Sequence, residues 1–401
     1  MNVHVTVVGL GADGWEGLPG SSRALVEGAR TLLGGDRHLA AVPAIPGQER
    51  RAWPSPLRDG LPDLVASADG PVVALASGDP LVSGIGTTLL DLLGTERVTI
   101  VPAVSSVALA RARMGWPAES VGVVSVVGRD VRLVVPALSA HRRLLVLSSD
   151  ESTPAAVATL LTDLGWGASR LVVLGDLGGP AETRIEGTAD AWHEDAPRLN
   201  VLAVEVRGTG PGWAVGGVLP DDAFEHAGQI TKRDVRASAL ARLAPAPGQL
   251  LWDVGAGSGS IGIEWMRAWP SARAVAIESR ADRADLVRRN AEVHGVPGLQ
   301  VVEGAAPYAL SGLDGPDAVF VGGGATVKGV LDACWAALRS GGRLVVHAVT
   351  AETEAVLLDR YRRHGGELVR LHVERAEPLG GFTGWTPARA VSQWSIVKGA
   401  S

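Results

Sequence analysis

Short apolar runs of four to seven residues alternate with helix-like segments through the first half of the chain. Continuous apolar runs separated by helices are typical of parallel strands that are covered on both faces. A helical pattern over 105–114 follows one of these runs. The pattern predicts an α/β fold with buried strands over 3–10, 71–76, 98–101, 144–148, 171–174 and 200–206.

A second α/β series begins after residue 220, behind a glycine-rich stretch over 209–217. Such stretches commonly separate domains. We therefore expect one domain over 1–208, a linker over 209–220 and a second domain over 221–401. In the second domain we predict a helix over 232–243, an antiparallel closing pair of 372–374 with 391–397, and strands over 250–254, 274–277, 299–302, 318–321 and 343–348.

Composition narrows the classes of function. The net charge is −6, no run of Lys or Arg occurs, and the chain has only three Phe and two Tyr, which argues against nucleic acid as a partner. A single cysteine, Cys334, excludes a disulfide framework and a cysteine-bound metal cluster, and we expect it in the core. No apolar run of about 18 residues and no secretory signal is present, so we expect a soluble, cytoplasmic protein without a membrane span.

A glycine-rich loop follows the predicted strand over 250–254 and opens a helix. It reads Asp-Val-Gly-Ala-Gly-Ser-Gly-Ser over 253–260. Glycines let the backbone turn sharply and approach a ligand, and a helix N-terminus adds free N–H groups. Glu278 ends the next strand, 25 residues after Asp253, where a carboxylate can accept hydrogen bonds from ribose hydroxyls. Together these features indicate a site for a ligand that carries a nucleoside.

The glycine spacing distinguishes between cofactors. It is Gly-x-Gly-x-Gly, not the Gly-x-Gly-x-x-Gly of dinucleotide sites, and no Tyr-x-x-x-Lys pair exists, which argues against an NAD(P) oxidoreductase. The loop resembles the S-adenosylmethionine (SAM) loop of class I methyltransferases. Ala305 stands where that family has an acid, so backbone groups are expected to contact the adenine. The resemblance implies a SAM site made of Asp253, Gly255, Ala256, Gly257, Ser258, Gly259, Glu278, Gly304, Ala305 and Ala306.

Three loops at predicted strand ends mark the first domain. In their order and spacing they resemble the tetrapyrrole (class III) methyltransferases, which bind SAM in a cleft between two α/β lobes. We expect the loop of Asp79 to hold SAM through main-chain groups, and Asp36 and His38 are further candidate contacts. The resemblance implies cofactor contacts from Gly9, Gly11, Gly78, Asp79, Pro80, Ser105 and Ser106.

Taken together, the two halves resemble the decarboxylating precorrin-6Y C(5,15)-methyltransferase family of cobalamin biosynthesis. The resemblance runs nearly end to end and is most specific over 11–18, 34–39, 229–233, 251–260 and 383–387. It implies a two-lobed tetrapyrrole methylase fold followed by a Rossmann-like class I domain, with one SAM site in each. It also places Thr231 near SAM and admits a homo-oligomer.

The same resemblance implies the reaction. The first domain would methylate carbon 5 of a polycarboxylate tetrapyrrole. The second would methylate carbon 15 and remove carbon dioxide from the acetate on carbon 12. Lys232, Arg233 and Lys328 are candidate anchors for the carboxylate arms because they flank the expected cleft.

Two alternatives stay open at this stage. They are a SAM-dependent RNA methyltransferase, which the acidic balance opposes, and a non-catalytic SAM-binding protein. The sequence does not distinguish a cobalt-containing from a metal-free substrate. Nor does it give the order of the methylations or the residue that assists decarboxylation.

Overall fold

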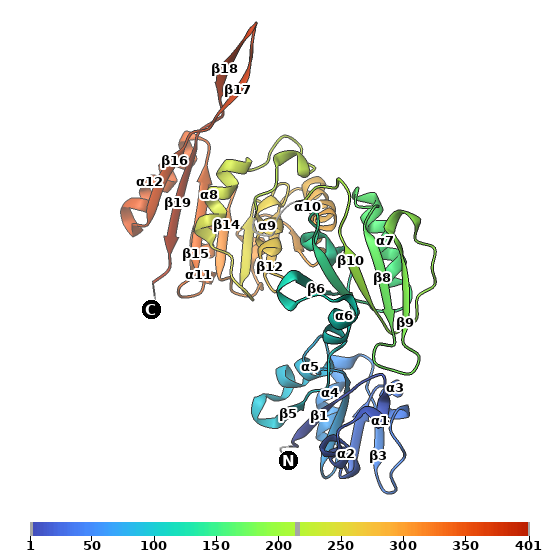
Figure 1. Ribbon diagram of the computed structural model, residues 1–401. Helices are drawn as coiled ribbons and strands as arrows, with labels where there is room; N and C mark the ends of the chain where they lie inside the picture. Colours follow the sequence, from blue (N-terminus) through green and yellow to red (C-terminus); the bar gives the residue numbers. More distant parts are fainter. Residues whose placement is uncertain (1–2, 213–216, 400–401) are drawn as a thin grey trace. The chain divides into compact units, whose positions relative to one another are not determined.

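The computed structural model describes residues 3–212 and 217–399 (Figure 1). The chain forms two compact units, one of Met1–Val134 with Ser139–Gly212 and the other of Val135–Leu138 with Trp213–Ser401. Part of the expected linker, 213–216, lies outside the described residues. The domain limits expected at 208 and 221 stay a prediction. None of the helices in the described ranges is long and apolar enough to cross a membrane.

The N-terminal unit begins with a parallel sheet in the order β3-β2-β4-β1-β5. Alternate residues of the first strand enter two different hydrophobic clusters, one on each face, so both faces are covered. The strands are β1 (Val5–Leu10), β2 (Thr31–Gly34), β3 (Glu49–Ala52), β4 (Val72–Ser77) and β5 (Val98–Val101). The helices are α1 (Gly14–Gly17), α2 (Gly20–Glu27), α3 (Asp36–Ala40), α4 (Leu57–Ala66) and α5 (Ile85–Leu93).

A second five-stranded sheet of the same unit has the order β6-β7-β10-β8-β9. The prediction of parallel strands is partly wrong for this sheet: β6 and β7 are parallel, but β10 runs antiparallel to both of its neighbours and β9 runs antiparallel to β8. A short connection such as the one between β8 and β9 allows only antiparallel pairing, because parallel neighbours need a longer crossover. The elements are α6 (Ser106–Met114), β6 (Val121–Ser125), β7 (Arg143–Leu147), α7 (Thr153–Asp163), β8 (Arg170–Gly175), β9 (Thr183–Thr188) and β10 (Asn200–Glu205).

A seven-stranded sheet forms the centre of the C-terminal unit, in the order β13-β12-β11-β14-β15-β19-β16. The chain reverses its direction of travel across the sheet between β11 and β14, which makes their boundary a topological switch point. Among the described strands of this sheet, β19 runs antiparallel to both of its neighbours, β15 and β16, and the other neighbouring pairs are parallel. The strands are β11 (Leu250–Val254), β12 (Arg273–Glu278), β13 (Gln300–Glu303), β14 (Ala318–Val321), β15 (Arg343–Ala348), β16 (Glu367–Leu371) and β19 (Val391–Val397).

Helices cover both faces of this sheet, and separate hydrophobic clusters lie on its two sides. Cys334 is buried in one of the clusters, and burial raises its thiol pKa to about 12, so the expectation of a core position is confirmed. The helices are α8 (Arg233–Leu243), α9 (Ser260–Ala268), α10 (Ala281–Val293), α11 (Val330–Ala337) and α12 (Ala351–His364). Short 3₁₀ turns complete the described chain at Thr95–Arg97, Ala118–Ser120, Val131–Ala137, Ala189–Ala191, Asp221–Ala223 and Tyr308–Leu310.

The predicted closing pair is half wrong. The partner of β19 is β16, five residues upstream of the predicted 372–374. Glu374 instead begins a two-stranded hairpin, β17 (Glu374–Leu379) with β18 (Phe382–Pro387), that extends away from the sheet in Figure 1. Both hairpin strands are mostly exposed and carry no buried apolar run, so the sequence pattern does not reveal them. The other predicted strands are confirmed to within two residues at each end.

Candidate functional site

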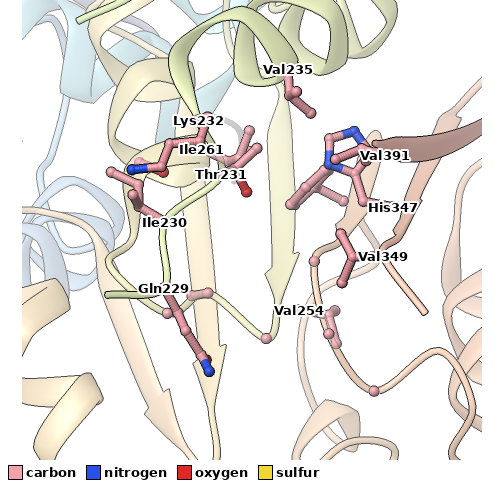
Figure 2. Close-up of a pocket in the computed structure, with 18 of the residues that line it drawn as sticks. Gln229, Ile230, Thr231, Lys232, Val235, Val254, Ile261, His347, Val349 and Val391 are labelled. Atoms are coloured by element: carbon pink, nitrogen blue, oxygen red, sulfur yellow. The ribbon is translucent and has the colours of Figure 1, made fainter. Parts of the chain in front are cut away.

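A cavity of about 790 Å³ opens at the carboxyl ends of the central strands of the C-terminal unit. Its lining follows β11, β12, β14 and β15 and includes the segment 228–232 that precedes α8. Figure 2 shows part of this lining, with Thr231 and His347 facing the same space. We call it the C-terminal cavity. It lies at the switch point, where open α/β sheets bind their ligands.

The loop between β11 and α9 depends on glycine. The φ angle is +72° at Gly255, +60° at Gly257 and +76° at Gly259, a left-handed conformation that other residues rarely adopt. A Cβ at Gly255 would lie 2.8 Å from the backbone nitrogen of Gly323, in the loop after β14. The two loops can therefore meet only through bare backbone, which leaves main-chain groups at the cavity wall.

Two carboxylates support this loop in different ways. Glu278 accepts a hydrogen bond from the Gly257 N–H at 2.9 Å and stands at the cavity wall. Asp253 is buried and accepts one from the Gly262 N–H at 3.0 Å, while its Oδ1 has no partner among the described residues. Burial raises the pKa of Asp253 to about 7, and the charge of Glu278 adds to the shift. Asp253 thus shapes the loop from behind, and Glu278 keeps lone pairs for a ligand.

A buried arginine fixes the segment that precedes α8. Arg236 is 0% exposed, and it donates to Glu264 at 2.8 Å and to Asp221 at 3.2 Å. Its guanidinium also donates to the carbonyl oxygens of Thr231 and Leu219. A buried guanidinium needs acceptors for its five donors, so these contacts hold Thr231 beside the glycine loop.

His347 lies in the cavity wall at the end of β15 and is absent from the sequence prediction. It is 7% exposed, its Nε2 lies 2.8 Å from Gln393 Oε1, and its ring meets Phe320 edge-on at 4.9 Å between centroids. Burial lowers its pKa to about 4, so the imidazole is neutral at pH 7. The sequence feature that could have revealed His347 is a histidine inside an otherwise apolar predicted strand.

Of the three substrate anchors expected from the sequence, one lines the C-terminal cavity and two do not. Lys232 lines the C-terminal cavity, and its Nζ lies 3.7 Å from Asp221 Oδ2. Arg233 lies outside the lining and donates from Nε to the Val218 carbonyl at 3.1 Å. Lys328 is exposed and also lies outside the lining. No motif marks the other cations of the lining, which are Arg283, Arg375 and Arg389.

A second cavity, of about 260 Å³, lies within the N-terminal unit. We call it the N-terminal cavity; both sheets of the unit contribute to its lining. The loops after β1, β4 and β5 meet there backbone to backbone, with the Ala103 N–H donating to the Gly78 carbonyl at 3.1 Å. A Cβ at Gly9 would lie 2.0 Å from that carbonyl oxygen and 2.6 Å from the Ala103 nitrogen. Only glycine at position 9 allows this approach.

Polar side chains around the N-terminal cavity mostly hold their own loops. Ser105 caps α6 by accepting from the Ala108 N–H at 3.1 Å, and Asp79 accepts from the Leu81 N–H at 2.9 Å. The guanidinium of Arg37 donates to Ser77 Oγ at 2.8 Å, and burial lowers its pKa. The sequence prediction missed several polar lining residues, namely Arg37, Ser148, Arg198 and Asn200.

Comparison with known proteins accounts for both units. The tetrapyrrole (corrin/porphyrin) methylases match residues 4–192, and the precorrin methyltransferase domain matches residues 222–398. A relative from Sinorhizobium sp., named precorrin-6Y C(5,15)-methyltransferase [decarboxylating], is 47% identical over 98% of this chain and 96% of its own. This chain belongs to the decarboxylating precorrin-6Y C(5,15)-methyltransferase family. The N-terminal unit is therefore its tetrapyrrole methylase domain, and the C-terminal unit its class I methyltransferase domain.

Two shorter relatives carry narrower names. A probable cobalt-precorrin-6B C(15)-methyltransferase (decarboxylating) from Saccharolobus solfataricus is 36% identical over 34% of this chain and 71% of its own. A cobalt-precorrin-7 C(5)-methyltransferase from Salmonella typhimurium is 35% identical over 43% of this chain and 84% of its own. One of these shorter relatives is thus named for methylation at carbon 15 and the other for methylation at carbon 5.

The structure gathers most of the expected SAM residues of this methyltransferase at the two cavities. The C-terminal lining contains Thr231, Gly255, Ala256, Gly257, Glu278, Gly304, Ala305 and Ala306, and it leaves out Asp253, Ser258 and Gly259. The N-terminal lining contains Gly11, Gly78, Asp79, Ser105 and Ser106, and it leaves out Gly9, Pro80, Asp36 and His38. Their contact with SAM stays a prediction.

Proposed function

We propose that this enzyme carries one SAM site in each domain and divides the reaction between them. The C-terminal domain methylates carbon 15 of precorrin-6Y and decarboxylates the acetate on carbon 12, and the N-terminal domain methylates carbon 5. The observation that supports this division is the match of each half to a different methyltransferase domain, together with the separate names of the two shorter relatives.

The C-terminal cavity suits SAM in its chemistry. Bare backbone at Gly255 and Gly257 lets a ligand approach the strand end closely. Glu278 already accepts backbone hydrogen bonds from Gly257 and Arg280 and a longer one from the Ser279 hydroxyl, and the lone pair that remains can accept a ribose hydroxyl. SAM supplies a methyl group on a positively charged sulfur, which an electron-rich carbon attacks directly. The protein therefore needs no nucleophile of its own, and its main task is to position the two reactants.

The wall of the C-terminal cavity carries positive charge. Lys232, Arg283, Arg375 and Arg389 line it, and Arg283 belongs to α10, which follows Glu278. Arg375 lies within 3.3 Å of Asp234 and 4.0 Å of Asp221, so carboxylates already hold its guanidinium. Incoming carboxylate arms of a tetrapyrrole can form the same kind of charge-assisted hydrogen bond. Arg375 and Arg389 thus extend the anchor set expected from the sequence, which already contained Lys232.

In the N-terminal domain, main-chain groups are proposed to do most of the binding. The loops after β1, β4 and β5 offer backbone N–H and carbonyl groups, while Asp79 and Ser105 use their side chains within their own loops. SAM in this cavity would be held mainly by shape and backbone hydrogen bonds. We further propose that the enzyme works in the cytoplasm and without a nucleic acid, in agreement with its net charge of −6.

Mass spectrometry of the product tests this division. The wild-type chain with SAM and the reduced tetrapyrrole precursor should add two methyl groups and release one carbon dioxide. Gly9→Ala, which forces a Cβ against the Gly78 carbonyl, should stop at one added methyl with carbon dioxide still released. Gly20→Ala is the matched control, because a Cβ there meets nothing within 4 Å. Loss of decarboxylation in Gly9→Ala, with the control normal, would contradict the assignment.

A further inference from the structure

His347 stands on the substrate side of the C-terminal cavity. Its strand, β15, lies beyond β14, while the glycine loop and Glu278 belong to β11 and β12 on the other side of the switch point. Both groups nevertheless line the same cavity. In Figure 2 the imidazole projects into the wall between Val391 and Val235, with a ring nitrogen toward the space that Thr231 faces.

The hydrogen bonds behind the ring determine its tautomer. Arg242 donates to Ser238 Oγ at 2.9 Å, and Gln393 donates its Nε2 to the same oxygen at 3.2 Å. Gln393 therefore turns its Oε1 toward His347 Nε2, 2.8 Å away. An amide oxygen only accepts, so Nε2 carries the hydrogen and Nδ1 carries a lone pair.

The surroundings keep this imidazole neutral. Burial lowers its pKa to about 4, and the positive charge of Arg242 behind it acts in the same direction. Phe320 on β14, Val391 on β19 and Val235 on α8 are the apolar neighbours in the wall. The carboxylates in the described lining are Asp234 and Glu278, and the second belongs to the SAM side. His347 is therefore the neutral base that the substrate side offers.

Of the two half-reactions proposed above for this domain, methylation releases one proton and decarboxylation consumes one. Carbon 15 uses its electron pair to form a bond to the methyl group, and the sulfur keeps the pair of the broken C–S bond. Carbon 15 then loses its hydrogen as a proton, and the C–H pair restores the conjugated double bond. When carbon dioxide leaves, the C–C pair enters the conjugated ring, and the exposed CH₂ carbon must gain a proton to become a methyl group. The sum balances without a proton from solvent.

We propose that Nδ1 of His347 takes the proton that carbon 15 loses and returns it to the carbon from which carbon dioxide departs. The proposal rests on the function proposed for the C-terminal domain. One base in one cavity then serves both steps, and methylation prepares the acid that decarboxylation needs. A weak base suffices because the methylated, cationic intermediate is strongly acidic. The resulting imidazolium is a strong donor for the same reason.

Reaction of the full chain in deuterium oxide tests the transfer. Wild-type enzyme should form a carbon-12 methyl group with clearly less than one deuterium, because the hydrogen from carbon 15 is carried over. His347→Gln should release carbon dioxide at least about 100-fold more slowly than the wild type, in line with the loss of a general acid–base group. The carbon-12 methyl group formed by this variant should contain a full deuterium, because solvent then supplies the proton. SAM titration should show unchanged affinity, since Glu278 and the glycine loop are untouched.

His294→Gln is the matched control. His294 is also fully buried in the C-terminal domain, but it lies outside the cavity lining and pairs with the Ala223 carbonyl at 2.9 Å. Its variant should keep the wild-type rate and deuterium content. A full deuterium in the wild-type methyl group would overturn the transfer, whatever the rate of the variants. Absence of methylation and decarboxylation in the wild-type chain would instead overturn the proposed function.

Discussion

The two cavities of this enzyme, proposed to hold the same methyl donor, are lined by different kinds of chemical group. The C-terminal cavity follows a single glycine loop and carries Glu278 in its wall, with Asp253 buried behind. The N-terminal cavity is shaped by three loops that touch through their backbones, at Gly9, Gly78 and Ala103. Its charged lining includes the guanidinium of Arg37. We therefore propose that a carboxylate binds the ribose hydroxyls in the first, whereas backbone groups do so in the second, where Asp79 is engaged by the Leu81 N–H of its own loop.

On the proposal that both cavities bind SAM, one ligand does not require one kind of site. In a class I sheet, a strand end and the next strand's acid lie close together because adjacent parallel strands end at the same edge. In the tetrapyrrole methylase domain, the cavity lining comes from the loops after three neighbouring strands and from a second sheet, and its carboxylate, Asp79, accepts a hydrogen bond from its own loop. Charge substitutions should therefore affect the C-terminal half far more than the N-terminal half.

Glu278→Gln should give the largest effect among the charge variants. Loss of a charge-assisted hydrogen bond costs about 1.5–3 kcal/mol, so SAM affinity at one site should fall about 10- to 100-fold. Calorimetric titration should find two sites in the wild type and one strong site in the variant. Glu303→Gln is the control, because Glu303 ends the neighbouring strand β13 but lies outside the lining. Equal weakening of both sites by Glu278→Gln would remove the contrast between the cavities.

Lys232→Ala should give a smaller effect, on the tetrapyrrole and not on SAM. A solvent-exposed ion pair contributes about 0.2–1 kcal/mol, so the KM for the tetrapyrrole should rise about two- to fivefold with little change in kcat. The readout is steady-state release of carbon dioxide. Arg233→Ala, one residue further on but outside the lining, should stay at the wild-type KM. An equal rise in both variants would show that the whole helix start, and not the cavity wall, attracts the substrate.

Asp253→Asn should leave the binding of both ligands unchanged and act on stability alone, because Asp253 lies outside the cavity lining. The folded pKa of Asp253 is about 7 and its unfolded pKa is about 3.9, so the folded state binds more protons between these values. Stability is therefore lost as the pH rises through that window, and asparagine should remove the loss. The variant should melt above the wild type at pH 7.5, by about 2–4 °C for each kcal/mol of this loss. Scanning calorimetry at several pH values checks this, and a difference that does not shrink toward pH 4 would contradict it.

The strands that the sequence predicted in both domains coincide with observed strands because each contains an apolar run. The runs over 250–254, 318–321 and 343–348 coincide with β11, β14 and β15. The prediction missed the short buried strand β2, and it missed β3, β6, β9 and the β17–β18 hairpin, whose side chains are mostly exposed or half-buried. Such strands are stabilised by pairing with a neighbour, and a local pattern carries no record of that neighbour.

By itself, the sequence determined the fold class, the two kinds of methyltransferase domain and the glycine loop with Glu278, because these depend on residues close together along the chain. Only the tertiary structure decided which cations line the C-terminal cavity. Lys232 and Arg375 line the C-terminal cavity while Arg233 and Lys328 do not. It also placed His347 opposite the SAM loop and gave it Gln393, 46 residues away, as a hydrogen-bond partner. Side chains that are distant in sequence come together only when the strands pair, so the set of residues that line this side of the cavity could not be predicted from local sequence.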